Sequence, residues 1–171
     1  SFSSPADALA HGVAMVFQET NLIPSMTVAQ NLFLGEESFF NRLRGVNIRA
    51  QQQLQRLSFH VEPTALVSSL GAAKKQMVEI ARAVQHNARI FIFDEPTATL
   101  TPEEKQHFFA LVERLRAEGG SIIFISHALE EALAIADRIS ILRDGALVAT
   151  DEARGFTRDR IIQAMVGRQL K

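Results

Sequence analysis

The chain has 171 residues, of which 47% are hydrophobic, with no cysteine and a formal net charge of −1 at pH 7. This composition is typical of a globular domain, and the lack of cysteine excludes disulfides, thiol catalysis and zinc–thiolate sites. The near-neutral charge supplies no positive field for phosphates, so nucleic acid is not expected as a partner. No apolar run approaches the roughly 20 residues that span a bilayer, and no signal-peptide pattern opens the chain. Because the chain begins at Ser1 instead of Met, we expect a fragment of a longer protein.

The first half is predicted to form one strand followed by helices. Residues 12–17 (GVAMVF) are apolar and valine-rich, which indicates a buried strand, and a loop follows through Pro24. Helical sequence extends from 27 to about 57, with a turn predicted at 41–47 (NRLRGVN). Residues 72–85 predict a helix whose apolar face consists of Met77, Ile80, Ala81 and Val84.

In the second half strands and helices alternate, which is typical of a parallel sheet with crossover helices. The expected elements are a strand over 89–93, a helix over 102–119, a strand over 121–127, a helix over 129–136, a hairpin turning at Asp144–Gly145, and a helix from about Thr157. The inward face of the helix over 102–119 is predicted to hold Phe108, Leu111, Val112 and Leu115. Residues 27–84 are therefore interpreted as an insertion between strands of one α/β core.

Polar side chains follow the ends of the predicted parallel strands. Asp94 and Glu95 end one strand, Ser126 and His127 end the next, and Gln18 follows the first. Right-handed crossovers place the carboxyl ends of such strands at one edge of the sheet, where open α/β sheets bind ligands. We therefore expect these five side chains to converge.

The chemistry that suits this cluster is metal-assisted hydrolysis of a phosphoanhydride. Asp94 would orient Mg²⁺ through water, and Glu95 would polarise the attacking water. His127 would donate a hydrogen bond to the terminal phosphate, while the neutral amide of Gln18 would touch metal or water. Taken singly, each residue has an ordinary interpretation: an Asp-Glu pair after a strand is more often a helix cap or a solvated loop end, and His127 a boundary histidine.

Three motifs, in order, resemble those of ABC transporter ATP-binding subunits. FIFDEPTATLT at 91–101 is similar to the Walker B strand, catalytic glutamate and D-loop, and FISH at 124–127 to the switch-histidine loop. VFQETNLIPSMTVAQNLFLG at 16–35 is similar to the Q-loop and the start of the helical subdomain. The sequences QMVEIARA at 76–83, ADRISILRDG at 136–145 and MVGR at 165–168 resemble the first nucleotide-binding domain of tandem monosaccharide-import ATPases.

The resemblance implies an α/β fold, a P-loop NTPase-type core with a parallel sheet that is truncated at the N-terminus, plus an inserted α-helical subdomain. The core would comprise residues 1–26 and 88–171, and the helical subdomain about 27–87. The implied function is ATP binding and hydrolysis that drives import of a sugar. The implied site residues are Glu95 and His127 for catalysis, Asp94 and Gln18 for the metal, and Gln18, Gly71, Ala72, Ala73 and Thr99 for the nucleotide.

The resemblance also implies partners: a second ABC ATPase domain, transmembrane permease subunits and, indirectly, a periplasmic sugar-binding protein. The implied location is peripheral, at the cytoplasmic face of the inner membrane. A permease contact surface is expected from Gln18 to Leu34, with Phe33, Phe39 and Phe40 as exposed apolar candidates. Core packing is the alternative for Phe33.

Two departures from the family pattern concern the nucleotide. No segment reads Gly-x-x-x-x-Gly-Lys-Ser/Thr, so the loop that binds the phosphates of ATP is missing. Tight binding of ATP and Mg²⁺ is expected to need that segment, and the isolated chain is expected to be inactive and to self-associate through surface left uncovered. The family signature, commonly Leu-Ser-Gly-Gly-Gln, aligns with LGAAK at 70–74, which predicts a weakened composite site. The D-loop departs as well, with Thr101 where aspartate is frequent.

Two alternative functions remain open. One is a non-transport ABC ATPase that remodels nucleic acid, against which the near-neutral charge argues. The other is a catalytically weakened or silent ABC domain, against which the presence of Glu95 and His127 argues.

Overall fold

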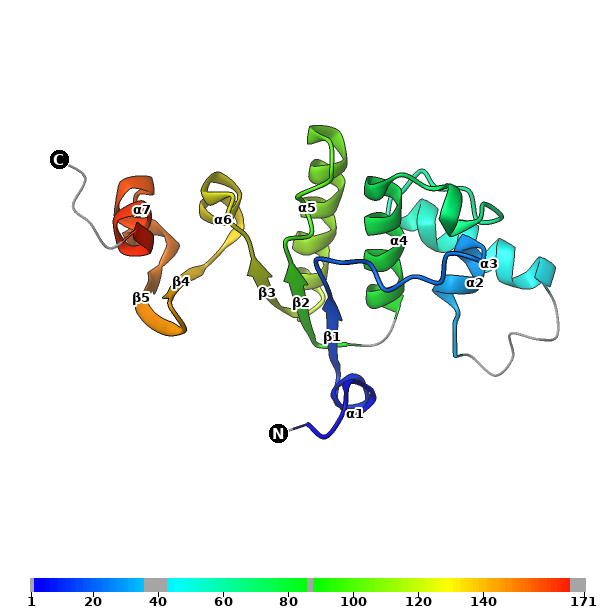
Figure 1. Cartoon of the computed structure of the whole chain (residues 1–171), viewed down its shortest axis with the longest axis horizontal. Coiled ribbons are helices and arrows are strands. Elements are labelled where there is room, and N and C mark those ends of the chain that lie inside the picture. Colours follow the sequence, from blue (N-terminus) through cyan, green and yellow to red (C-terminus); the bar gives the residue numbers. More distant parts are fainter. Residues whose placement is uncertain (1, 36–42, 86–87, 167–171) are drawn as a thin grey trace. The chain divides into compact units, whose positions relative to one another are not determined.

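The computed structural model describes residues 2–35, 43–85 and 88–166, and the chain divides into two compact units, Ser1–Ile125 and Ser126–Lys171 (Figure 1). Each unit has its own sheet. The first contains three parallel strands, and the second contains a two-stranded antiparallel hairpin.

The sheet of the first unit has the order β1-β2-β3, with β1 at Val13–Val16, β2 at Ile90–Asp94 and β3 at Ser121–Ile125. All pairings are parallel, and Val16, Phe93 and Phe124 lie side by side across the sheet. The predicted parallel sheet is therefore confirmed. Because α2, α3 and α4 lie between β1 and β2 in the chain, the predicted helical insertion between strands is also present.

The first unit has five α-helices among its described residues: α1 (Pro5–Ala10), α2 (Val28–Leu32), α3 (Leu43–Arg56), α4 (Ala72–Gln85) and α5 (Pro102–Ala117), and a short 3-10 helix at Val67–Ser69. Sequence reasoning missed α1, which is only six residues long. Its start had a local signal, since the Ser4 side chain accepts a hydrogen bond from the Asp7 backbone N–H and Pro5 occupies the first helical turn.

The turn predicted at 41–47 is wrong from Leu43 onward, because α3 continues through Gly45. Val46, Ala50 and Leu54 recur every four residues in α3, and all three are buried. Burying such side chains contributes more than the roughly 1 kcal/mol that glycine costs within a helix. Packing therefore outweighs the local preference for a turn.

One face of the three-stranded sheet packs against α5 in an aromatic cluster. The Phe108 ring lies 5.2 Å from that of Phe93, edge to face, and 6.2 Å from that of Phe124. The predicted inward face of α5 is confirmed, because all four of its residues are buried: Phe108, Leu111, Val112 and Leu115. The apolar face predicted for α4 is likewise buried at Met77, Ile80 and Ala81 and partly buried at Val84.

The second unit contains α6 (Leu129–Ile135), β4 (Arg138–Arg143), β5 (Ala146–Glu152) and α7 (Arg158–Val166). Asp144 and Gly145 join β4 to β5 with φ values of 51° and 77°. Two positive φ values are those of a type I′ turn, so the predicted hairpin is confirmed. Ile141, Phe156 and Ile161 form the buried centre of this unit.

Candidate functional site

The carboxyl end of β2 changes backbone conformation between Asp94 and Glu95. Asp94 is the last residue of the strand and pairs with Ile125 of β3. Glu95 has a φ of 47°, in the left-handed region, while its backbone N–H still donates a hydrogen bond to the carbonyl of Ile125 at 2.9 Å. A non-glycine residue in this region costs on the order of 1 kcal/mol, and such strain is concentrated at functional sites. In a strand the side chains of Asp94 and Glu95 would point to opposite faces of the sheet, and the left-handed backbone of Glu95 ends this alternation.

Gln18 lies two residues beyond the end of β1, and its side chain reaches the neighbouring strand end. Its Nε2 atom donates a hydrogen bond to Oε2 of Glu95 at 3.2 Å. The parallel pairing of β1 with β2 places these strand ends side by side. The structure therefore brings together two of the predicted site residues, which lie 77 positions apart in the sequence.

Residues 17–24, here termed the Gln18 loop, are held at their far end by a buried amide. Asn31 of α2 is fully buried, and its Oδ1 atom accepts a hydrogen bond from the Ile23 backbone N–H at 2.7 Å. Its Nδ2 atom donates to the carbonyls of Ile23 at 3.1 Å and Thr27 at 3.0 Å. The two contacts with Ile23 fix the approach of the Gln18 loop to α2, and sequence reasoning did not single out Asn31.

His127 lies two residues beyond the end of β3 and belongs to the second unit. The hydroxyl of Ser126 accepts a hydrogen bond from the Ala128 backbone N–H at 3.0 Å, which orders the turn into α6. The approach of His127 to Glu95 stays a prediction, because the two residues belong to different units.

The segment aligned with the family signature lies at the start of α4. Gly71 is exposed and its carbonyl accepts the first helical hydrogen bond, from the Lys75 N–H at 3.1 Å, while Ala72 and Ala73 form the first turn. A Cβ atom added at Gly71 would meet nothing within 4 Å. The position therefore has room for the serine that this chain lacks.

Thr99 and Thr101 lie between β2 and α5. Thr99 is exposed in the turn after Glu95. Thr101 caps α5: its hydroxyl accepts from the Glu104 N–H at 3.3 Å, and the Glu104 carboxylate accepts from the Thr101 N–H at 2.8 Å. Since aspartate is also a good N-cap, Thr101 retains the capping ability of the residue that is frequent here in the family.

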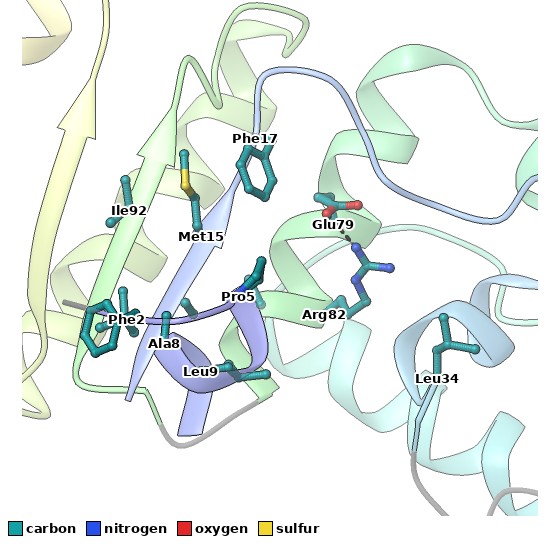
Figure 2. Close-up of a pocket in the computed structure, with 13 residues that line it drawn as sticks. Phe2, Pro5, Ala8, Leu9, Met15, Phe17, Leu34, Glu79, Arg82 and Ile92 are labelled. Carbon is teal, nitrogen blue, oxygen red and sulfur yellow. Dashed lines mark hydrogen bonds and ion pairs between the residues drawn. The ribbon is translucent and has the colours of Figure 1, made fainter. Parts of the chain in front are cut away.

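The expected permease contact surface is only partly exposed. Phe33 is 3% exposed and the Arg49 guanidinium lies 4.2 Å from its ring centre, so the core-packing alternative is correct and its proposed exposure is wrong. Phe39 and Phe40 lie outside the described residues. Leu34 is exposed and lines an apolar cavity of about 570 Å³ together with Phe17 (Figure 2).

None of the helices in the described ranges is both long and apolar enough to cross a bilayer. Within the same ranges, no group of three or more His, Asp or Glu side chains is arranged to hold a metal ion.

Curated relatives match almost the whole chain. It is 43% identical over 169 residues to the ribose import ATP-binding protein of Chelativorans sp. (strain BNC1), covering 99% of this chain and 33% of that protein. It is 44% identical over 172 residues to a putative ribose/galactose/methyl galactoside import ATP-binding protein of Burkholderia ambifaria, with the same two coverages. The chain thus spans about a third of the length of the curated relatives it matches.

Solved structures match the fold. One is a dimeric ATP-binding cassette in a post-hydrolysis state with ADP and phosphate, at TM-score 0.73 and 26% identity, covering 84% of this chain and 64% of that chain. Another is a nucleotide-free ATP-binding cassette from an ABC transporter, at TM-score 0.74 and 23% identity, covering 98% of this chain and 69% of that chain. The predicted α/β fold of the P-loop NTPase type is confirmed by these likenesses. The ABC transporter family model matches residues 3–98, more than half of the sequence, and the chain therefore belongs to the ABC transporter family.

Proposed function

We propose that this chain is part of an ATP-binding and ATP-hydrolysing subunit that powers an ABC importer for a sugar. The observation that carries the proposal is the geometry of Glu95, which has a left-handed backbone at a strand end and a carboxylate 3.2 Å from the Gln18 amide. The names of the relatives, which are import proteins for ribose or galactose, support the choice of a sugar.

In the proposed mechanism Glu95 accepts a proton from the water that attacks the terminal phosphate of ATP. Gln18 orients the Glu95 carboxylate by its hydrogen bond. Asp94 and the amide oxygen of Gln18 would hold Mg²⁺, since carboxylate and amide oxygens are ligands that this ion accepts. Mg²⁺, when bound, would neutralise phosphate charge. His127 would donate a hydrogen bond to the terminal phosphate.

The signature segment is proposed to complete a nucleotide site on a second ABC ATPase domain. Gly71, Ala72 and Ala73 would offer backbone N–H groups from the first turn of α4, and Thr99 would lie near the same nucleotide. Lys74, which is exposed, adds positive charge there. Without the signature serine this composite site is weakened instead of abolished.

The proposed assembly places the domain against transmembrane permease subunits, peripherally at the cytoplasmic face of the membrane, with a periplasmic sugar-binding protein acting indirectly. The core would be residues 1–26 and 88–171, with a helical subdomain over about 27–87. Within the expected contact surface, Leu34 is the large apolar side chain that is exposed among the described residues. The alternative of a non-transport ABC ATPase is less favoured, because the relatives are named as import proteins. The alternative of a catalytically weakened ABC domain rests on the altered signature at 70–74.

The test uses a chimera in which residues 1–171 replace the matching segment of the Chelativorans ribose import protein. Glu95→Gln in this chimera should lower kcat for ATP at least about 100-fold while ATP binding is retained, because the amide cannot accept the proton. Glu103→Gln, an exposed change in the first turn of α5, is the matched control and should leave turnover unchanged. Equal turnover in the Glu95→Gln and unsubstituted chimeras would remove Glu95 from the mechanism.

A further inference from the structure

The Gln18 loop crosses from β1 to α2 without helix or strand of its own. Gln18 contacts Glu95 near its start, and Asn31 holds Ile23 near its end. Between these two points lies Asn21, which is exposed and whose backbone carbonyl points to a third element, α4. The side chain that meets this carbonyl belongs to Arg82.

Arg82 donates hydrogen bonds in two directions. One terminal nitrogen donates to the Asn21 carbonyl at 3.1 Å, and the other donates to the Glu79 carboxylate at 2.7 Å. Figure 2 shows Arg82 and Glu79 on α4, joined by the second of these contacts. The planar guanidinium holds its donors in a fixed fork, so one side chain satisfies both acceptors with a defined geometry.

Burial makes the position of Arg82 well determined. The side chain of Glu79 is 3% exposed and that of Arg82 is 22% exposed, so their ion pair is poorly screened by solvent. Separating a buried carboxylate from its partner strongly destabilises the folded chain. The guanidinium of Arg82 is therefore expected to stay beside Glu79. The donor that remains is thereby fixed toward Asn21, three residues after Gln18.

We propose that Arg82 is a positioning residue that makes the location of Gln18, and so its contact with Glu95, depend on the location of α4. The signature segment at Gly71–Lys74 starts this same helix. Arg82 therefore links the strand-end site of this domain to the segment proposed to complete the nucleotide site of a second domain. This inference rests on the proposed function and adds to it a coupling element between the two nucleotide sites.

The test reads the motion of the Gln18 loop directly. Because the chain contains no cysteine, Glu19→Cys provides a single attachment point for a nitroxide spin label in the loop, and Glu103→Cys provides one on α5 as a control site. Glu79→Gln alone removes the charge of the ion pair but keeps an amide oxygen that accepts from Arg82, so the Arg82 donor to Asn21 is expected to stay in place. Glu79→Gln with Arg82→Met removes that donor as well, without leaving a buried carboxylate unpaired.

The label at position 19 is expected to show narrower, more mobile spectra in the double variant than in Glu79→Gln, while the label at position 103 shows no difference. Equal mobility at position 19 in both variants would overturn the proposal. Equal loosening at positions 19 and 103 would also overturn it, because Arg82 would then act on the whole fold. Circular dichroism spectra of both variants should match that of the unsubstituted chain.

A second readout uses the chimera described above. The double variant should lower kcat for ATP about tenfold relative to Glu79→Gln, with KM changed less than about twofold, because the Gln18 loop acts on the chemical step. Unchanged kcat with a loosened loop would overturn the positioning of Gln18 by Arg82. An unsubstituted chimera that does not hydrolyse ATP would instead overturn the proposed function, since the spin-label comparison does not depend on hydrolysis.

Discussion

Gln18, in the loop after β1, donates a hydrogen bond at 3.2 Å to the carboxylate of Glu95, which directly follows β2 and has a left-handed backbone. Parallel pairing of β1 with β2 makes this contact possible, because it brings both strand ends to one edge. The contact gives Glu95 a defined direction before any substrate arrives.

Loss of the Gln18 side chain should slow hydrolysis. Gln18→Ala in the chimera is expected to lower kcat between about 10-fold and 100-fold, because the Glu95 carboxylate loses its orienting donor. The adjacent Glu19→Ala is the control, since Glu19 is exposed in the same loop. Steady-state ATP hydrolysis checks both variants. An equal loss of kcat in Gln18→Ala and Glu19→Ala would show that the Gln18 side chain has no specific role in hydrolysis.

Restoring the signature serine should strengthen the composite site. Gly71→Ser in the chimera is expected to raise kcat/KM for ATP several-fold, because a hydroxyl becomes available to the phosphate and the added Cβ meets nothing within 4 Å. Gly71→Ala adds the same Cβ without the hydroxyl and should give no gain. A similar gain in kcat/KM from both substitutions would show that the added Cβ acts through the backbone of α4, and not through the serine hydroxyl.

Removal of the α5 cap should destabilise the chain. Thr101→Ala is expected to lower the free energy of unfolding of the first unit by about 1 kcal/mol, because the Glu104 N–H loses its side-chain acceptor. Thr101→Asp keeps an acceptor and should be close to neutral. Urea unfolding followed by circular dichroism measures both changes, and equal stability of the alanine variant and the unsubstituted chain would contradict the capping argument.

The sequence predicted those features that depend on periodicity and on strand order. The buried face of α5 follows from helical periodicity, and the parallel sheet and the placement of Gln18 and Glu95 at one edge follow from the alternation of strands and helices and from crossover geometry. The hydrogen bond between these two side chains was not predicted. It did not predict the helical conformation of Gly45, because burial of its neighbours in α3 decides that conformation. Nor did it predict the positive φ of Glu95, since glutamate carries no preference for the left-handed region.

Contacts that join distant segments through the backbone were also beyond sequence reasoning. Arg82 and Asn31 each bind main-chain atoms of the Gln18 loop, and a main-chain carbonyl acceptor or N–H donor has no signature in the amino-acid sequence. In the sequence both residues belong to ordinary helical patterns. Side chains of this kind are found only once the loop has a defined path.

The three-stranded sheet should mediate self-association of the isolated chain. On the face opposite α5, β3 carries two exposed side chains, Ile123 and Ile125, and β1 and β2 add Met15 and Ile90. Contiguous apolar surface of this kind favours association with a second copy. Ile123→Glu is expected to shift the chain toward the monomer in sedimentation velocity, because a buried carboxylate in such an interface would lack a partner.

The control is Leu66→Glu, which places the same charge at another exposed apolar residue of the first unit, away from the sheet. It should leave the distribution of monomer and dimer unchanged. A chain that is monomeric without substitution up to about 100 μM would contradict the prediction. Equal shifts from both substitutions would point to net charge, and not to the sheet face, as the cause.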